Sequence, residues 1–373
     1  MNDLVTLHAP LAGALTAAVR RVLDSGWFIL GREVAAFEEA FAAYCGVPHA
    51  VGVGNGTDAI ELALAGVGAG RGSRVALAAN AGGYGTTAVL ALGAEPVYVD
   101  VDEATATMDP ACLDRAGRDG GFDAVLVTHL YGRLADMAAL RAVADRHGAA
   151  VVEDCAQAHG ATRAGRRAGA WGDAAAFSFY PTKNLGALGD AGAVVTADAG
   201  VAGRVRRLRQ YGWDRKYHQA DGPARNSRMD ELQAAVLGVK LPHLDDWNAR
   251  RARVAARYAA TVRHPALTLP HVAAGEHVAH LYVLRAADRA ARDALAAHLR
   301  AAGVPHDVHY PVPDHRQPVH GGRFDALTLP VTERLCAQVL SVPCHPALGD
   351  DDVDRVTAAL DAFRGAEVTT CTA

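Results

Sequence analysis

Short apolar runs alternate with longer amphipathic segments along much of the chain. The apolar runs lie at 50–54, 74–78, 96–101, 123–130 and 149–156. The segments between them, such as DAIELALAGV and ADMAALRAVADRHG, repeat apolar residues at helical spacing. This alternation predicts βαβ units, and therefore an α/β fold with a mostly parallel central sheet flanked by helices. Ligands of such sheets bind at the carboxyl ends of the strands, so the residues just after each run are the first candidates for a site.

The later part of the chain changes character. Two more strands are predicted at 174–180 and 191–196, joined by PTKNLGALGD. A long helical segment is interrupted at Pro242 and resumes beyond it, as a helix that bridges two domains can do. Shorter, Pro- and His-rich pieces with two predicted helices follow. We therefore expect a large domain with an N-terminal arm over residues 1–245, and a smaller C-terminal α+β domain over 246–373.

Composition and charge exclude several classes of protein. The formal net charge is −4 and the isoelectric point is near 6.5, so there is no electrostatic reason to expect a nucleic-acid partner. The start of the chain lacks the basic and apolar regions of a secretory signal, and no apolar run is long enough to span a bilayer. We expect a cytoplasmic protein without a membrane partner.

The cysteines form no pattern that indicates a metal or a disulfide framework. None forms a CxxC pair, and none clusters with histidine at zinc-site spacing. We predict neither a metal site nor structural disulfides. The six residues are Cys45, Cys112, Cys155, Cys336, Cys344 and Cys371.

The segment SFYPTKNLGALGDAGA places Lys183 in a turn between two apolar strands. Because the flanking strands should be buried, the ammonium is expected near the strand ends rather than on a solvated helix face. A lysine desolvated in this way has a lowered pKa and can act as a Schiff-base nucleophile. For the lysine taken alone, an ordinary loop residue is the better interpretation.

The segment VVEDCAQAHG ends a predicted strand with two adjacent carboxylates, Glu153 and Asp154. Side chains alternate along a strand, so the two acids should lie on opposite faces of the sheet. An acid at the carboxyl end of a strand can keep a pyridinium nitrogen protonated, which makes pyridoxal phosphate (PLP) an electron sink. The alternative is that the pair caps the helix that follows, a position for which Asp is well suited.

The segment VGNGTDAIELAL supplies a third element. Gly56 and Thr57 stand at the start of an amphipathic helix, where free backbone N–H groups, a hydroxyl and the positive end of the helix dipole suit a phosphate. Alone, this segment is only a helix start. Together, the three segments place a lysine, a carboxylate and a phosphate cradle in one α/β domain, which is the combination that PLP chemistry needs.

These segments resemble the motifs of the DegT/DnrJ/EryC1/StrS family of PLP-dependent sugar aminotransferases, which have the fold-type-I architecture. The resemblance covers nearly the whole chain, from SGWFILGREVAAFEEAFAAYCG to HYPVPDHRQP and beyond. Its most specific segments are GNGTDAIELAL, HLYGRLADM, VEDCAQAHGA, SFYPTKNLGALGD and NSRMDELQAAVLGVKLPHLDDWNARR.

The resemblance implies roles for the residues in these segments. Lys183 would carry the cofactor and catalyse proton transfer, Asp154 would bind the pyridine nitrogen, and Gln157 would lie near the phenolic oxygen. One segment departs from the family pattern T-[FY]-x-A-T, in which an aromatic residue stacks on the pyridine ring. The corresponding stretch is ANAGGYGTTAV, in which Tyr84 is displaced by about two positions. The glycines around Tyr84 permit unusual backbone angles, so we expect it to contact the cofactor.

The resemblance also implies how the phosphate is held. Gly56, Thr57 and Ser178 would bind it within one subunit. Asn226, in the NSR motif, resembles the family residue that reaches the phosphate from the partner subunit. The implied assembly is therefore an obligate homodimer with two composite active sites.

Family-like loops contain further candidates for the substrate side of the site. Most of the 17 histidines must be structural or exposed, and a surface salt bridge explains Arg228 equally well. The candidates are His129, Tyr131, Tyr217, Arg228, His309, Tyr310 and His315.

The resemblance implies transfer of an amino group from glutamate or glutamine to a nucleotide-linked keto-deoxysugar, with dTDP as the preferred nucleotide. The cofactor would alternate between PLP and pyridoxamine phosphate, and a 3-keto sugar is favoured over a 4-keto sugar. Within the enzyme class, the alternative substrate is a keto-cyclitol of the scyllo-inosose type. Outside it, the alternative is a PLP-binding regulatory protein without turnover, against which the intact set of site residues argues.

Overall fold

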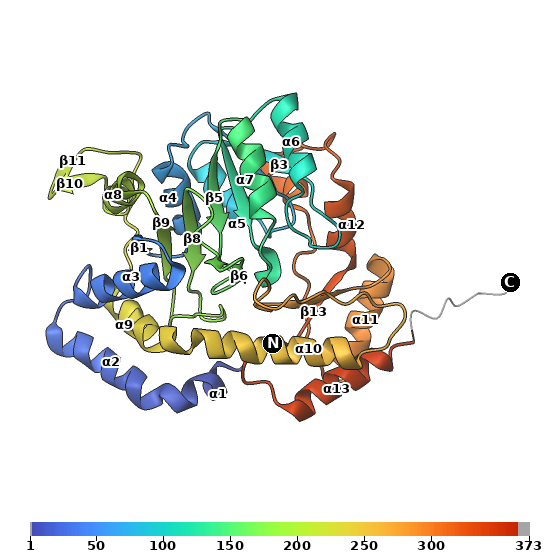
Figure 1. Cartoon of the computed structure of the whole chain (residues 1–373). Coiled ribbons are helices and arrows are strands. Elements are labelled where there is room, and N and C mark those ends of the chain that lie inside the picture. The colour runs from blue at the N-terminus through green and yellow to red at the C-terminus, as the bar shows by residue number, and fades with distance from the viewer. Residues whose placement is uncertain (1, 365–373) are drawn as a thin grey trace.

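A seven-stranded sheet forms the centre of the computed structural model, which describes residues 2–364 (Figure 1). The strand order is β1-β9-β8-β5-β4-β2-β3. All strands run in one direction except β9, which pairs antiparallel with both β8 and β1. The predicted α/β fold with a mostly parallel sheet is confirmed. The strands are β1 (His49–Val53), β2 (Arg74–Ala78), β3 (Glu95–Val99), β4 (Ala124–Thr128), β5 (Ala150–Asp154), β8 (Ala174–Ser178) and β9 (Gly192–Thr196).

Helices cover both faces of the sheet, which is why its strands are apolar runs rather than alternating ones. Val152 of β5 belongs to the hydrophobic core on one face, and its neighbour Val151 belongs to the core on the other. The first face packs against α4 (Gly56–Gly66), α5 (Tyr84–Ala91) and α8 (Ala199–Leu208). The opposite face packs against α3 (Arg32–Cys45), α6 (Pro110–Asp119), α7 (Met137–Arg146) and α9 (Glu231–Lys240).

A nearly continuous helical rod links the sheet to the C-terminal part of the chain (Figure 1). It consists of α9 and α10 (Leu244–Thr261), and the predicted interruption at Pro242 is a short 3-10 helix over Leu241–His243. The N-terminal arm, α1 (Leu4–His8) and α2 (Ala12–Ser25), lies along the outer side of this rod.

The C-terminal part has its own hydrophobic core, in which Tyr258 of α10 packs with Tyr282, Leu295 and Leu360. Two antiparallel strands, β12 (Tyr282–Arg285) and β13 (Val339–Val342), are surrounded by α10, α11 (Arg289–Ala301) and α13 (Asp350–Asp361). The helices α11 and α13 are the two that the sequence predicted, whereas α12 (Pro330–Gln338) was not predicted. The domain boundary expected after residue 245 falls in the first turn of α10 and stays a prediction.

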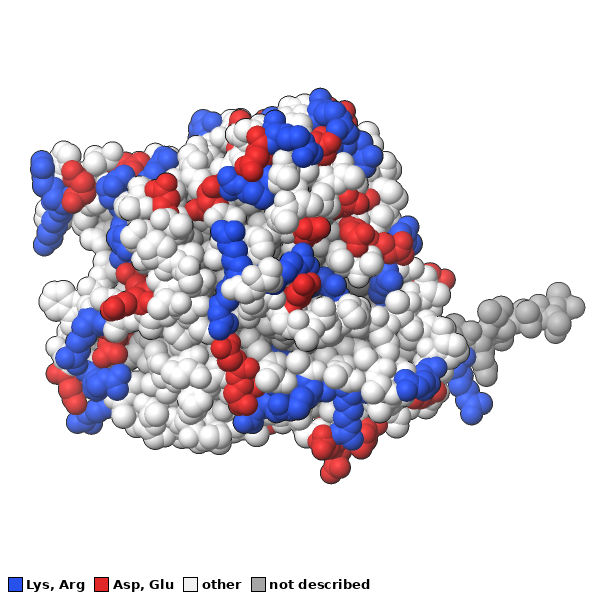
Figure 2. Space-filling model, in the orientation of Figure 1, with Lys and Arg blue, Asp and Glu red and all other residues white. Residues whose placement is uncertain are grey.

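Two small hairpins complete the fold, β6–β7 (Thr162–Arg163 and Arg166–Arg167) and β10–β11 (Trp213–Arg215 and His218–Gln219). The second stands away from the body of the molecule (Figure 1). The five cysteines that the structure describes are free, and Cys371 lies outside the described residues. Within residues 2–364, no helix combines the length and apolarity needed to cross a membrane. Figure 2 shows basic and acidic side chains interspersed over the visible face.

Candidate active site

A cavity of about 640 Å³ lies at the carboxyl ends of the parallel strands. Its walls come from the ends of β4, β5 and β8, the N-termini of α4 and α5, the loop that precedes β12, and the loop at 307–310. The cavity brings together these predicted site residues: Gly56, Thr57, Tyr84, Asp154, Gln157, Ser178, Lys183, His309 and Tyr310.

Lys183 lies in the turn between β8 and β9, where its backbone N–H donates to the carbonyl of Tyr180 at 2.8 Å. Its side chain lines the cavity at the strand ends, as the sequence predicted. Burial lowers the pKa of Lys183 below its ordinary value, and the negative charge of Asp154 opposes this effect. A lysine in this setting holds more of its amine in the neutral, nucleophilic form.

Asp154 is the last residue of β5, and its carboxylate faces the same cavity. The Thr128 hydroxyl donates to it at 3.2 Å and the Ala156 N–H at 3.1 Å. Burial raises the pKa of Asp154 despite these bonds and the nearby charge of Lys183. A cationic group placed against this carboxylate would offset the cost of burial and favour its ionised form.

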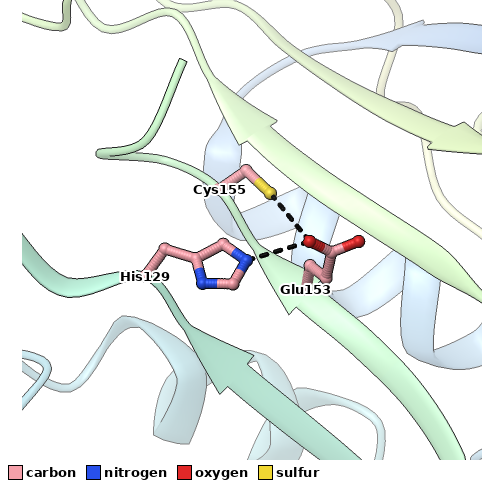
Figure 3. A group of neighbouring side chains, drawn as sticks. All are labelled: His129, Glu153 and Cys155. Atoms are coloured by element: carbon pink, nitrogen blue, oxygen red, sulfur yellow. Dashed lines mark hydrogen bonds and ion pairs between the residues drawn. The ribbon is translucent and has the colours of Figure 1, made fainter. Parts of the chain in front are cut away.

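Glu153 points to the opposite face of the sheet, toward His129 and Cys155 (Figure 3). The Nδ1 of His129 accepts the N–H of Ala135 at 3.2 Å, so the ring proton is on Nε2 and is donated to Glu153 at 2.9 Å. The Cys155 sulfur lies 4.0 Å from the same carboxylate oxygen. These three ligand-type groups meet behind the sheet rather than in the cavity.

The carboxylate of Glu153 is already satisfied by protein donors. Three backbone N–H groups donate to it at 2.7–3.0 Å, from Gly169, Trp171 and Gly172. Burial would raise the pKa of Glu153, but the bond from His129 and these N–H groups hold it below its ordinary value. The cluster therefore ties the 169–172 loop to the sheet. The lone pairs of the Glu153 carboxylate are occupied by these hydrogen bonds.

Gln157 stands on the cavity wall with both ends of its amide engaged. Its Oε1 accepts the backbone N–H of Tyr131 at 2.6 Å, and its Nε2 donates to the Tyr310 hydroxyl at 3.1 Å. Tyr131 is itself buried outside the cavity, and its hydroxyl donates to the carbonyl of His309. The predicted substrate residue Tyr131 thus orients Gln157 from behind.

The N-terminus of α4 fits a phosphate. Asn55 caps the helix by accepting the N–H of Asp58 at 2.9 Å, which leaves the N–H groups of Gly56 and Thr57 without an acceptor within residues 2–364. A Cβ added at Gly56 would lie only 2.4 Å from the Cβ of Ser178. Glycine is therefore required for the helix to approach Ser178 this closely, and both residues line the cavity.

Tyr84 begins α5 and is 53% exposed at the cavity. The two preceding glycines, Gly82 and Gly83, have φ values of 80° and 82°, a backbone conformation that favours glycine. The ring of Tyr84 meets that of Tyr310 edge-on, with centroids 6.2 Å apart. Contact between Tyr84 and a bound cofactor stays a prediction.

Two histidines expected on the substrate side are buried elsewhere. The His129 side chain is fully buried at Glu153, and His315 is buried with its Nε2 3.0 Å from Glu333. Neither lines the cavity, and a ring enclosed by protein cannot contact a substrate. The structure therefore corrects this expectation for both residues: they hold loops in place.

Three other candidates lie near the β10–β11 hairpin, away from the cavity of their own subunit. Asn226 and Tyr217 are exposed, and Tyr217 is 77% exposed. The guanidinium of Arg228 lies 5.7 Å from the ring centre of Tyr211. These positions leave the three side chains available to another molecule.

Sequence reasoning missed several residues of the cavity wall. Some of them, such as Asn55 and Thr182, lie within motifs that the sequence analysis had singled out. His280 and Asp307 come from the C-terminal part, where no strand–helix alternation indicated which loops return to the sheet. The missed polar residues are Asn2, Asn55, Thr128, Tyr180, Thr182, Asp190, His280 and Asp307.

Two buried histidines make the stability of the fold depend on pH. Burial lowers the pKa of His159 and of His277 from 6.5 to about 3. Both histidines bind a proton more readily in the unfolded chain than in the folded one. The stability that each neutral ring contributes is therefore present above pH 6.5 and is lost as the pH falls toward 3. Each histidine should lower the free energy of unfolding by about 2 kcal/mol between pH 6.5 and about 5.

Urea unfolding across this pH range measures the effect. His159→Phe is the matched variant, because His159 packs between the rings of Phe177 and Phe179, and it should flatten the slope. A free energy of unfolding that stays constant from neutral pH to about pH 5 would contradict the assignment.

Comparison with known proteins identifies the class to which this fold and site belong. The sequence profile of the DegT/DnrJ/EryC1/StrS aminotransferase family matches residues 11–361. The chain belongs to this family. The family and enzyme class predicted from the sequence, a PLP-dependent sugar aminotransferase, are confirmed.

Individual relatives match over almost their whole length. The erythromycin biosynthesis sensory transduction protein EryC1 of Saccharopolyspora erythraea is 48% identical over 96% of this chain and 98% of its own. The dTDP-3-amino-3,4,6-trideoxy-alpha-D-glucose transaminase of Streptomyces venezuelae is 46% identical over 97% of this chain and 94% of its own. The crystal structure of S. venezuelae DesV in complex with a ketimine intermediate superposes with a TM-score of 0.91, at 46% identity and 96% coverage of both chains.

Proposed function

We propose that the chain transfers an amino group from glutamate or glutamine to a nucleotide-linked keto-deoxysugar, with dTDP as the nucleotide and the 3-keto sugar favoured. The observation that carries the proposal is the single cavity lined by Lys183, Asp154, Gln157 and the N-terminus of α4. The sugar is supported by the S. venezuelae relative, which is named for a dTDP-linked 3-amino sugar and is 46% identical.

The residues of the cavity fit PLP. Lys183 offers a buried amine of lowered pKa, and Asp154 offers a buried carboxylate that a cation would stabilise. Gly56 and Thr57 offer backbone N–H groups at a helix N-terminus for the phosphate. When bound, PLP supplies an electron sink for the carbon that carries the nitrogen.

The chain's own residues would then divide the work. Lys183 would bind the cofactor covalently and, once released, its amine would move a proton between the substrate carbon that carries the nitrogen and the cofactor. Its lowered pKa suits this role, because the neutral amine is the form that acts as a base. Asp154 keeps the pyridine nitrogen protonated, and Gln157 orients the phenolic oxygen through the Nε2 proton that Tyr310 does not use.

We further propose a homodimer with composite sites. Asn226, Tyr217 and Arg228 do not reach the cavity of their own subunit, and two of them are exposed. Large apolar side chains are exposed beside the lysine turn, just after the N-terminal arm and next to the β10–β11 hairpin, which is unusual for a surface that meets only water. They include Trp27, Phe28, Tyr180, Leu188 and Tyr211.

Two alternatives stay open at this site. A keto-cyclitol would need the same cofactor chemistry without a nucleotide. A regulatory protein without turnover is favoured by one observation, since the relative EryC1 is named as a sensory transduction protein. The complete set of Lys183, Asp154 and Gln157 in one cavity argues for turnover.

Absorbance of the purified protein during each half-reaction tests the proposed function. Glutamate should convert the PLP absorption to that of pyridoxamine phosphate, and a dTDP-3-keto-deoxysugar should restore it. The matched dTDP-4-keto sugar and scyllo-inosose serve as comparisons, and we expect slower recovery with both. Recovery only by scyllo-inosose would select the cyclitol alternative. A protein that is not converted by glutamate or glutamine would contradict the aminotransferase activity.

A further inference from the structure

Asp314 is a fully buried acid that none of the roles assigned above uses. It begins the short 3-10 helix over Asp314–Arg316, in the C-terminal part of the chain. Its basic neighbours His315 and Arg316 pair with Glu333 instead, and Asp314 forms no ion pair within residues 2–364. Burying a carboxylate without a cation is costly, so the hydrogen bonds that it accepts must offset that cost.

The side chain and the backbone of Asp314 both bind the segment that leads from β2 to α5. Its Oδ1 accepts the N–H of Gly83 at 2.9 Å, and its Oδ2 accepts the hydroxyl of Thr86 at 3.3 Å. Its own N–H donates to the carbonyl of Ala79 at 2.7 Å. Burial raises the pKa of Asp314 to about 6, and the bonds from Gly83 and Thr86 oppose this effect. The carboxylate is therefore mainly ionised at neutral pH.

This carboxylate lies at the end of α5 that lacks a cap of its own. Gly83 is the N-cap residue of α5, and it has no side chain that could accept an N–H. The bonds from Gly83 and Thr86 place the Asp314 carboxylate at this end, where the helix dipole favours a negative charge. An acid that is 231 residues away in the chain thus performs part of the role of the missing cap.

Tyr84 depends on the turn before it for its position. Gly82 and Gly83 have positive φ values, and glycine loses more conformational freedom on folding than any other residue. The side chain of Tyr84 is half exposed and meets the ring of Tyr310 edge-on. Its own contacts therefore hold it weakly, and the backbone of the turn sets where its ring lies at the cavity.

The loop that carries Asp314 contacts the same turn at a second point. A Cβ added at Gly82 would lie 2.8 Å from the ring of Tyr310, so this ring rests directly on the glycine backbone. The loop thus packs a ring on Gly82 and bonds a carboxylate to Gly83. The second contact fixes the direction of the peptide, because a hydrogen bond is directional and ring packing is not.

We propose that Asp314 is a positioning residue that acts through Tyr84: its carboxylate holds the glycine turn, and the turn holds the ring of Tyr84 against the bound cofactor. The inference rests on the proposed function in one respect, that the cavity binds PLP. It deepens that function, because it explains how an aromatic residue displaced by about two positions in the sequence can still serve the cofactor.

Two substitutions of similar shape separate the acceptor from the charge. In Asp314→Leu the volume of the side chain is largely kept, but the N–H of Gly83 loses its acceptor. In Asp314→Asn the amide oxygen can still accept that N–H, and the Thr86 hydroxyl can rotate to accept the new NH₂. If Asp314→Leu does not fold, the smaller Asp314→Ala provides the same comparison.

The first measurement needs no cofactor. Hydrogen exchange of the Gly83 amide in the full chain, followed by mass spectrometry, reports whether the turn is held. Loss of a hydrogen bond to a charged group should speed this exchange by about tenfold or more in Asp314→Leu. In Asp314→Asn a neutral acceptor remains, and the exchange should stay within about threefold of wild type. Strand β1 is the internal reference and should exchange alike in all variants.

The second measurement asks whether the effect passes through Tyr84. An aromatic contact is worth about a two- to tenfold change in affinity, so Tyr84→Ala and Asp314→Leu should each raise the Kd for PLP by about that factor. Titration followed by visible absorbance gives the Kd, and Asp314→Asn should bind PLP nearly as wild type does. In the double variant Tyr84→Ala/Asp314→Leu the second substitution should add little, because no ring is left to position.

Unchanged exchange at Gly83 in Asp314→Leu would overturn the inference. Losses of PLP affinity that add in the double variant would also overturn it, because a purely structural role for Asp314 would lower the affinity whether or not Tyr84 is present. The proposed function fails in a different way. If borohydride reduction of the wild-type protein with PLP labels no cofactor onto Lys183, the cofactor assignment is wrong, whatever the exchange at Gly83.

Discussion

Lys183→Ala should reduce turnover by at least about 10⁴-fold, the upper end of what a positioned acid–base group contributes. Lys183 is the one lysine of the chain's three that lines the cavity, since Lys216 is exposed and Lys240 is buried against the carbonyl of Gly186. No other primary amine of a side chain is therefore placed to replace it. The Lys183 amine makes no hydrogen bond within the described residues, so its removal should leave the fold intact.

Borohydride reduction followed by peptide mapping checks the assignment. The wild-type protein should carry cofactor on the peptide that contains Lys183, and Lys183→Ala should carry none while it still binds pyridoxamine phosphate. Lys216→Ala is the matched control and should still carry cofactor on the peptide that contains Lys183. Turnover by Lys183→Ala within about tenfold of wild type would remove the central assignment.

The same variant tests the composite site. Mixed dimers of Lys183→Ala and Asn226→Ala subunits contain one site with both substitutions and one with neither, provided that Asn226 serves the partner's cavity. Turnover should then rise above that of either parent dimer. If Asn226 acted in its own subunit, each site of the mixed dimer would carry one defect, and no recovery would follow.

The central sheet was predictable because the sequence signal of each strand is local. Each strand is buried on both faces, so each is a short apolar run that the sequence displays directly, and strands β1 to β5, β8 and β9 were all expected. The C-terminal part was less predictable. Its strands β12 and β13 pair across more than 50 residues, and their pairing leaves no local sequence signal. Helix α12 was also missed, although Pro330 at its first position is a local signal for a helix start.

The site residues divide in the same way: those placed by strand ends and helix starts were predictable, and those placed by long-range contacts were not. Asp154 and Ser178 are the last residues of their strands and Thr57 lies at a helix start, so topology alone places them together. His129 also stands past a strand, but its ring turns to the far face of the sheet, and a sequence does not show that rotation. His280 was missed because its ring is held at the cavity by a hydrogen bond to Asn184, which is 96 residues away in the chain.

Asp154→Asn should reduce the rate of the half-reaction with glutamate by about 10²–10³-fold, the cost of removing one preorganised group that stabilises developing charge. The substitution is nearly isosteric. Its amide oxygen can still accept the N–H of Ala156, which lies 3.1 Å from Asp154 Oδ1. The Thr128 hydroxyl can rotate to accept the new NH₂ in place of donating to the carboxylate. The change therefore removes the charge and leaves the packing.

The rate can be separated from cofactor binding, because Lys183 is unchanged in this variant. Stopped-flow absorbance gives the rate of conversion by glutamate, and borohydride trapping gives the fraction of protein that carries cofactor. Asp145→Asn, an exposed acid on α7, is the control for loss of a single negative charge. Normal trapping with slow conversion would show that Asp154 acts on the reactivity of the bound cofactor and not on its binding.

Two other outcomes have different meanings. Conversion at the wild-type rate would show that the carboxylate is dispensable, and that the raised pKa of Asp154 reflects burial without a catalytic purpose. Poor trapping with a normal rate per bound cofactor would assign Asp154 to binding alone. The buried carboxylate has a raised pKa, so its removal should cost the cofactor-free protein little stability.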